Sequence, residues 1–196
     1  MRNGRQMATL TNGSTSMSFK YDDSGIRTQK TVNGTTTQFY LNGSDILTQI
    51  TGSERFDFFY DDAGDLLGFK YGGNNYYYIR NLQNDIIGIL DSAGTQVVSY
   101  VYDSWGKLAS ISGPAKDTIG VKNPFRYRGY YYDTESGLYY LNSRYYDAEI
   151  RRFLNADSIL GADIDIVKYN LFRYCGNNPV NYVDSQGPLL DLLCFL

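Results

Sequence analysis

The chain has 196 residues, of which 42% are hydrophobic and 20% charged, so it contains enough apolar material to fold around a core. Because it has no histidine, a Ser/His/Asp or Cys/His catalytic group and any imidazole-bound metal are excluded on this chain. A formal net charge of −3 without a basic run argues against nucleic acid or an anionic membrane as the main partner.

The sequence shows neither a signal peptide nor a membrane span. No charged segment followed by an apolar run opens the chain, and no apolar run approaches the ~18 residues of a spanning helix. We therefore expect any export to be encoded in a longer parent protein. Cys175 and Cys194 form neither a CxxC pair nor a disulfide framework, and we interpret them as a core thiol and a tail thiol rather than as a redox or metal site.

Residues 1–110 are built from a repeat. The composition of 20 Tyr, 20 Gly and 10 Phe favours strands and glycine turns. A Tyr-Asp-x-x-Gly unit begins at Tyr21, Tyr60 and Tyr102, and half-period units open at Tyr40 and Tyr78, which gives a period of about twenty residues. An aromatic, partly alternating run precedes each unit, Asp begins a turn by accepting backbone N–H groups, and Gly supplies the positive φ that reverses the chain. Each repeat is therefore predicted to be an antiparallel β-hairpin.

Three Asn-Gly pairs, at Asn12, Asn33 and Asn42, are further turn signals. Each is followed by Ser or Thr and so also matches the glycosylation pattern, but we interpret them as hairpin turns. The Asp-rich turns lack the alternating Asp/Asn spacing and terminal Glu of a calcium loop, so no metal site and no cofactor are predicted.

A single hairpin cannot bury its own apolar face, so the repeats are expected to stack into an extended, strongly twisted antiparallel sheet. Small, polar and proline residues over 111–122 break the period, and we place an irregular connection there. About five hairpins leave unpaired sheet edges, so the sheet is expected to be open and to associate edge to edge.

Two tyrosine-rich strings follow this connection. They occupy residues 123–133 (NPFRYRGYYYD) and 137–147 (GLYYLNSRYYD), and the pattern continues through Arg152-Phe153 and Asp157 to residues 174–184 (YCGNNPVNYVD). Together with the upstream Tyr-Asp repeats, this order of motifs resembles the Rhs (rearrangement hotspot), or YD-repeat, proteins and their repeat-associated core domain over nearly the whole chain.

The resemblance implies a mainly β fold in which YD-repeat hairpins at 1–110 form a curved, spiralling sheet, a fragment of a hollow shell. A core domain at 123–187, with one or two short helices of which the likeliest lies within 164–174, closes the shell. The apolar tail at 188–196 is expected to pack against the inner face of the sheet. In this family the shell encloses the C-terminal toxin of a bacterial polymorphic toxin. The expected partners are therefore the upstream repeats and the toxin of a longer parent protein that is secreted or at the cell surface.

The core domain also resembles an aspartic-type autoprotease, which in the family cuts the chain just beyond a Pro-x-x-x-x-Asp-Pro-x-Gly-Leu signature. The signature falls on Pro179, Asp184, Ser185, Gly187 and Pro188, where Ser185 replaces the second Pro and Pro188 replaces the apolar residue at the cut. The cleavage region is therefore expected at Gly187, Pro188 and Leu189. Pro188 is the main departure, because its ring fixes φ and restricts Gly187.

Two carboxylates at such a site share a proton, so that one acts as acid and the other as base. The resemblance places Asp157 and Asp184 in these roles, with Arg152 as a supporting cation that holds Asp157 ionised. The alternative is that both carboxylates belong to turns and Arg152 is an ordinary surface strand residue. Arg151 stands where the family usually has Gly, which leaves the local backbone geometry open. At most, single-turnover self-cleavage is expected.

Aromatic hairpins of about twenty residues also build sugar-binding solenoids. A cell-wall or carbohydrate-binding repeat protein is therefore the alternative function, with clusters such as Tyr76-Tyr77-Tyr78, Tyr130-Tyr131-Tyr132 and Tyr139-Tyr140 stacking on sugars. The single Trp argues against it, because sugar platforms should recur in every repeat. We interpret these tyrosines as cross-strand packing.

Overall fold

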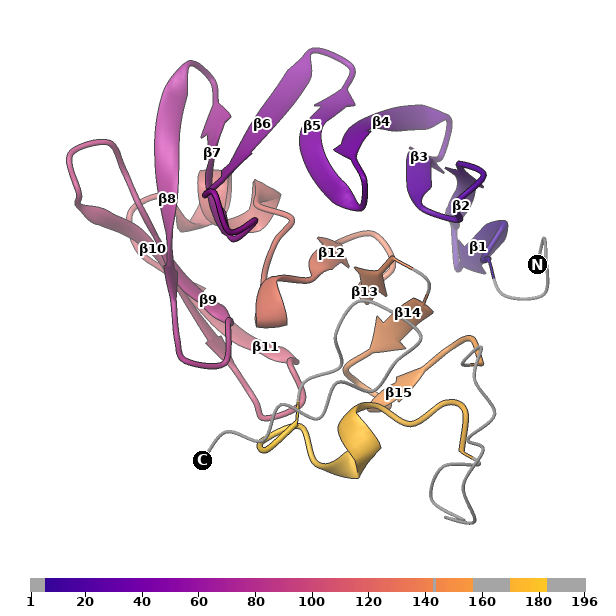
Figure 1. The fold of residues 1–196 in the computed structure, drawn as a ribbon. Helices are drawn as coiled ribbons and strands as arrows, with labels where there is room; N and C mark the ends of the chain where they lie inside the picture. The colour runs from indigo at the N-terminus through magenta and orange to yellow at the C-terminus, as the bar shows by residue number, and fades with distance from the viewer. Residues whose placement is uncertain (1–5, 143, 157–169, 183–196) are drawn as a thin grey trace.

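The structure, a computed structural model, describes residues 6–142, 144–156 and 170–182, and in it a long sheet bends around a shorter one (Figure 1). The long sheet, which we call the wall, consists of β1 (Thr9–Asn12), β2 (Thr15–Tyr21), β3 (Arg27–Val32), β4 (Thr35–Asn42), β5 (Asp45–Thr51), β6 (Glu54–Tyr60), β7 (Leu66–Tyr71), β8 (Asn74–Arg80), β9 (Ile86–Leu90), β10 (Gln96–Tyr102) and β11 (Leu108–Ser112). The short sheet consists of β12 (Tyr131–Asp133), β13 (Leu138–Leu141), β14 (Arg144–Asp147) and β15 (Arg152–Phe153). Short helical turns are η1 (Lys116–Gly120), η2 (Tyr127–Gly129) and η4 (Cys175–Asn177).

Each wall strand pairs antiparallel with its neighbours in sequence, in the order β1 to β11. The predicted antiparallel hairpin architecture is therefore confirmed. Within the described residues β1 and β11 each have a single neighbouring strand, so the wall is open, as expected. β11 ends at Ser112, and η1 lies inside the segment expected to be irregular.

Two kinds of turn connect the wall strands. Asn33 (φ 48°) and Gly34 (φ 86°) both have positive φ, which is the requirement of a type I′ hairpin turn. In the Tyr-Asp turn at Asp61, the carboxylate accepts hydrogen bonds from the backbone N–H groups of Ala63 (2.9 Å) and Asp65 (2.8 Å). Gly64 has φ 88°, so the predicted roles of Asp and Gly are both confirmed.

The tyrosine of each Tyr-Asp unit forms a hydrogen bond with the backbone of the preceding repeat. The hydroxyls of Tyr21, Tyr60 and Tyr102 donate to backbone carbonyls 14 to 16 residues upstream, at 2.8, 3.0 and 2.9 Å. The strand register shifts at or next to each of these tyrosines. Because such bulges bend a strand and lie at the same end of the wall, they favour its curvature.

Helical structure is confined to short turns in the described residues. The helix expected within 164–174 lies largely outside them, and the part that is described, 170–174, forms a turn and an isolated bridge. η2 and η4 lie within the predicted core domain but outside 164–174.

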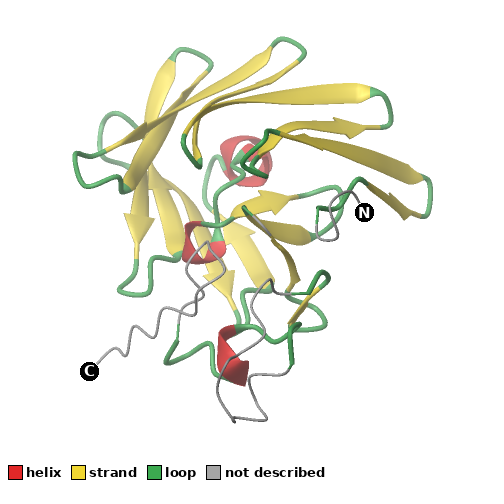
Figure 2. Ribbon diagram, turned by 45° about the vertical axis from the view of Figure 1, so that its right-hand side comes forward, coloured by secondary structure: helices red, strands yellow, loops and turns green. Residues whose placement is uncertain are grey.

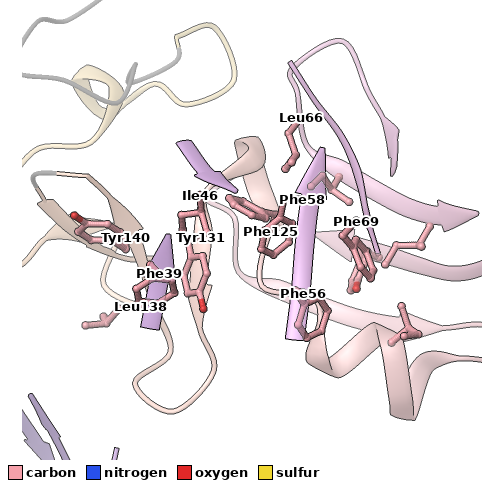
Figure 3. Close-up of a cluster of buried hydrophobic side chains, with 14 of the residues drawn as sticks. Phe39, Ile46, Phe56, Phe58, Leu66, Phe69, Phe125, Tyr131, Leu138 and Tyr140 are labelled. Carbon is pink, nitrogen blue, oxygen red and sulfur yellow. The ribbon is translucent and has the colours of Figure 1, made fainter. Parts of the chain in front are cut away.

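The two sheets share one hydrophobic core, which lies on the concave face of the wall (Figure 3). Phe39 of β4 meets Tyr131 of β12 with a ring-centroid distance of 5.4 Å, and Phe58 of β6 meets Phe125 at 4.9 Å. Both pairs are edge-to-face, the arrangement that aromatic rings prefer. The inner face of the wall is thus covered by residues that follow it in the chain.

Candidate functional site

The candidate site is the contact between the wall and the described residues of 123–182, which we call the core segment. Figure 2 shows the short sheet lying within the curve of the wall. Several groups of contacts join the two parts, and three of them lie at different parts of the wall.

The first group is a buried ion cluster between β3 and β12. Arg27 binds Asp133 through two N–H groups, at 2.5 and 3.1 Å, and Lys30 Nζ lies 3.0 Å from the same carboxylate. Lys30 also reaches Glu135 at 2.8 Å. The side chains of Arg27 and Asp133 are 1% and 0% exposed, so this pair joins the two sheets in the protein interior.

The surroundings keep Arg27, Lys30 and Asp133 charged. Burial alone would raise the pKa of Asp133, but Arg27 and Lys30 hold it below its usual value. Burial alone would lower the pKa of Arg27, and Asp133 raises it well above its usual value. The Arg27 guanidinium also lies 4.3 Å from the ring centroid of Tyr140 and 5.0 Å from that of Tyr131. A buried pair of this kind fixes how two elements dock, because removing either partner leaves an uncompensated charge.

The second group joins core tyrosines to the turn between β10 and β11. The hydroxyls of Tyr127, Tyr146 and Tyr139 donate to the carbonyls of Ser104 (3.0 Å), Trp105 (2.8 Å) and Gly106 (2.8 Å) respectively. These tyrosines are at most 2% exposed. Their rings therefore pack inside the protein. Of the tyrosine clusters for which cross-strand packing was predicted, Tyr130, Tyr131, Tyr139 and Tyr140 are buried, whereas Tyr77 is 40% exposed.

The third group joins the turn between β8 and β9 to the end of the core segment. The Arg128 side chain donates to the carbonyls of Gln83 (3.1 Å) and Pro179, and Gln83 Nε2 donates to the carbonyl of Val180 (2.7 Å). Asp85 accepts a hydrogen bond from the backbone N–H of Arg128 (3.0 Å). The sequence analysis assigned no role to Gln83, Asp85 or Arg128.

The residues predicted for self-cleavage are mostly beyond what the structure describes. Asp157, Asp184, Gly187, Pro188 and Leu189 lie outside the described residues, so the carboxylate pair stays a prediction. Arg152 is described, and it lies exposed on β15. Its backbone pairs with Asp147 of β14 on one side and forms an isolated antiparallel β-bridge with Arg173 on the other. Pro179, the first residue of the signature, is buried.

The described part of the chain contains one of the two cysteines. Cys175 is 1% exposed and belongs to an aromatic cluster, as expected of a core thiol, while Cys194 lies outside the described residues. No group of three His, Cys, Asp or Glu side chains comes together there as a metal site would require. Nor does any helix in those residues have the length and apolar character to cross a membrane.

Comparisons with known proteins agree with this geometry. A family model described as Teneurin YD-shell matches residues 3–180. The tRNA nuclease WapA of Bacillus subtilis (strain 168) is 40% identical over 173 residues, which cover 86% of this chain and 7% of that protein. The tRNA3(Ser)-specific nuclease WapA of Bacillus spizizenii is 39% identical with the same coverage. The chain thus spans about 7% of the length of these relatives.

The fold also occurs in solved structures. The crystal structure of TcdB2-TccC3-Cdc42 matches with a TM-score of 0.71 and 21% identity, over 91% of this chain and 9% of that chain. At this identity the likeness concerns the fold alone.

Proposed function

The chain belongs to the Teneurin YD-shell family, and from this premise we propose that it is the closing part of a shell that encloses the toxin of a longer bacterial protein. Its wall would continue the upstream repeats, and its core segment would close the shell at one end. The longer protein would act outside the cell that makes it, either secreted or at the cell surface.

The observation that carries this proposal is the way the core segment fills the concave face of the wall. The Arg27 and Lys30 pairs with Asp133 join strands about a hundred residues apart in sequence, and all three side chains are at most 5% exposed. A binding module would leave its concave face free for a ligand, whereas a closing element has to occupy it. The relation to nucleases called WapA also supports a toxin parent.

Electron microscopy of the full gene product tests the proposal. The expected result is a hollow shell whose end is closed by residues 123–182, together with a C-terminal domain inside that resists added protease until the shell is opened. Asp133→Asn should expose that domain, while Asp57→Asn, on a partly exposed pair of the wall, should not. A full gene product without an enclosed domain would contradict the proposal.

We also propose that the core segment supports one self-cleavage, through Asp157 and Asp184 with Arg152 in support. Phe153 lies four residues before Asp157 and Tyr182 lies two residues before Asp184, and both side chains pack in the same aromatic cluster. Asn155, also close to Asp157, is 2% exposed, and its side chain accepts a hydrogen bond from the backbone N–H of Tyr145 at 2.8 Å. The segments that lead into the two carboxylates are thus both anchored near one cluster.

Restoring the family residue at the cut tests self-cleavage. Pro188→Leu should produce a single cut near the C-terminus, visible by mass spectrometry as loss of the tail, because it frees Gly187 from the restriction that a following proline imposes. Adding Asp157→Asn or Asp184→Asn should abolish the cut, whereas Asp191→Asn, beyond the cut, should not. If Pro188→Leu stays whole at every pH at which the protein is folded, the proposal is wrong.

A further inference from the structure

We propose that the turn between β8 and β9 is a docking site for residues 178–182, and that Arg128 positions this segment on the wall. Docking itself is independent of self-cleavage. Its consequence for Asp184, two residues beyond Tyr182, rests on the self-cleavage proposed above.

The docking turn departs from the repeat. Where the other Tyr-Asp turns begin with Asp, this one begins with Asn81, whose Oδ1 accepts the same two hydrogen bonds, from the N–H groups of Gln83 (3.0 Å) and Asp85 (2.9 Å). Its Nδ2 then donates to the Asp85 carboxylate at 2.7 Å, a bond that an ionised Asp in its place could not donate. Asn84 (φ 69°) takes the position that Gly64 holds in the turn at Asp61.

Asp85 links this turn to Arg128. Its side chain is 9% exposed, and its second oxygen accepts the backbone N–H of Arg128 and lies 3.5 Å from the Arg128 Nε. Arg128 itself has φ 55°, a left-handed conformation that is unusual outside glycine. The bond from Asp85 to its backbone therefore helps to hold Arg128 in a conformation that a free chain would rarely adopt.

The Arg128 guanidinium binds one carbonyl of the β8–β9 turn and one carbonyl of the segment 178–182. One terminal nitrogen donates to the carbonyl of Gln83 and the other to the carbonyl of Pro179, and the Arg128 side chain is 1% exposed. Gln83 adds its own bond to the next carbonyl, that of Val180. The rigid fork of the guanidinium thus bridges the carbonyl of the turn and that of Pro179, which the single ammonium group of a lysine would not do in the same geometry. Together with the bond from Gln83, two successive carbonyls of the segment are held by two different side chains.

Residues 178–182 also form hydrogen bonds among themselves, and docking on the turn should keep these bonds closed to solvent exchange. The backbone N–H groups of Asn181 and Tyr182 both donate to the carbonyl of Asn178, at 3.3 and 3.1 Å. Hydrogen exchange at these two amides therefore reports whether the segment stays docked.

Amide hydrogen exchange of the full chain tests the docking site. Asn81→Asp should place two carboxylates against each other and speed exchange at Asn181 and Tyr182 about tenfold or more, while β13 keeps its protection. The matched control, Asp61→Asn at the same position of another turn, should leave these amides unchanged. Asn81→Asp combined with Asp85→Asn restores one amide and one carboxylate, and should recover most of the protection.

Two results would overturn the docking site: exchange at these amides within twofold of the parent chain in Asn81→Asp, or an equal increase in the Asp61→Asn control. The positioning role is measured separately in the Pro188→Leu background. There, Asn81→Asp should slow the cut about tenfold and the double variant should restore it. Faster exchange with an unchanged rate of cutting would overturn the positioning role, whereas Pro188→Leu that is never cut would contradict self-cleavage and leave the exchange result to decide docking.

Discussion

The wall and the core segment are stabilised by contacts of different kinds. Every wall strand pairs with its neighbour in sequence, and the repeated Tyr and Asp side chains bond within one repeat or to the one before it. The core segment is held by partners far away in the chain, such as Arg27 with Asp133 and Arg128 with Gln83. A repeat can therefore extend a wall by local rules, but docking the core segment on it requires residues that do not repeat.

The largest expected effect comes from the ion cluster. Asp133→Asn leaves the buried Arg27 and Lys30 without their shared carboxylate, and we expect it to lower the free energy of unfolding by about 3–5 kcal/mol. Urea unfolding followed by the fluorescence of Trp105, the single tryptophan, measures this change.

The control is Asp57→Asn, which breaks a pair with Arg55. The side chains of this pair are 59% (Arg55) and 36% (Asp57) exposed, so the substitution should change stability little.

The cluster also predicts a pH dependence of stability. Because the pKa of Asp133 is held below its usual value, its stabilisation is present at neutral pH and is lost as the pH falls through that lowered pKa. Asp133→Asn should weaken this fall of stability at acid pH. Equal losses of unfolding free energy in Asp133→Asn and Asp57→Asn would contradict the special role of the buried cluster.

Gly64 and Gly106 occupy equivalent positions in two wall turns, of which only Gly106 lies against a side chain of the core segment. Gly64 (φ 88°) and Gly106 (φ 85°) have the same conformation, but an added Cβ meets nothing within 4 Å at Gly64 and collides with the Tyr127 ring at Gly106. Gly64→Ala should cost about 1–2 kcal/mol of backbone strain, and Gly106→Ala a further ~1–3 kcal/mol of overpacking. Thermal and urea unfolding of the two variants would reveal the difference, and equal costs would mean that this turn is not seated on the core.

Alkaline pH should destabilise the contact between the wall and the core segment. Burial raises the pKa of Tyr131 from 10.0 to about 12, so the unfolded chain releases this proton first. Stability is therefore full below pH 10 and falls as the pH rises from 10 to about 12, by about 3 kcal/mol for one such residue. Urea midpoints across this range, with tyrosinate absorbance recorded in parallel, measure the loss. Tyr131→Phe should reduce the slope, and an unchanged slope would speak against this tyrosine as a cause.

The smallest expected effect is at Arg151, where the resemblance leads us to expect Gly. Arg151 adopts φ 61°, which favours glycine, and its guanidinium lies 5.3 Å from the ring centroid of Trp105. Arg151→Gly relieves strain but removes a cation–π contact of about 0.5–1 kcal/mol, so the net change in stability should stay below about 1 kcal/mol. The emission of Trp105 should nevertheless shift. A loss of more than about 2 kcal/mol would mean that this contact is a main attachment of the core segment.

The buried ion cluster could not be predicted from the sequence, because the burial of its side chains depends on how strongly the wall curves. The strand β3 contains Arg27, Lys30 and no aromatic residue, a composition typical of an exposed strand, yet both side chains are buried. Nothing local to Asp133 or Arg128 indicates which wall residue each will meet. The carboxylates Asp157 and Asp184 were identified through a resemblance, and they lie outside the described residues.

The sequence by itself determined the wall: the period of Tyr-Asp units, the Asn33-Gly34 turn and the antiparallel pairing all follow from hydrogen bonds between near neighbours. Only the tertiary structure decided how the core segment docks. The bend of the wall is the accumulated result of many strands and bulges, and this bend brings Arg27 to Asp133 and the β8–β9 turn to Val180. Local preferences act over a few residues, whereas these contacts join positions 97 and 106 residues apart, so no short pattern encodes them.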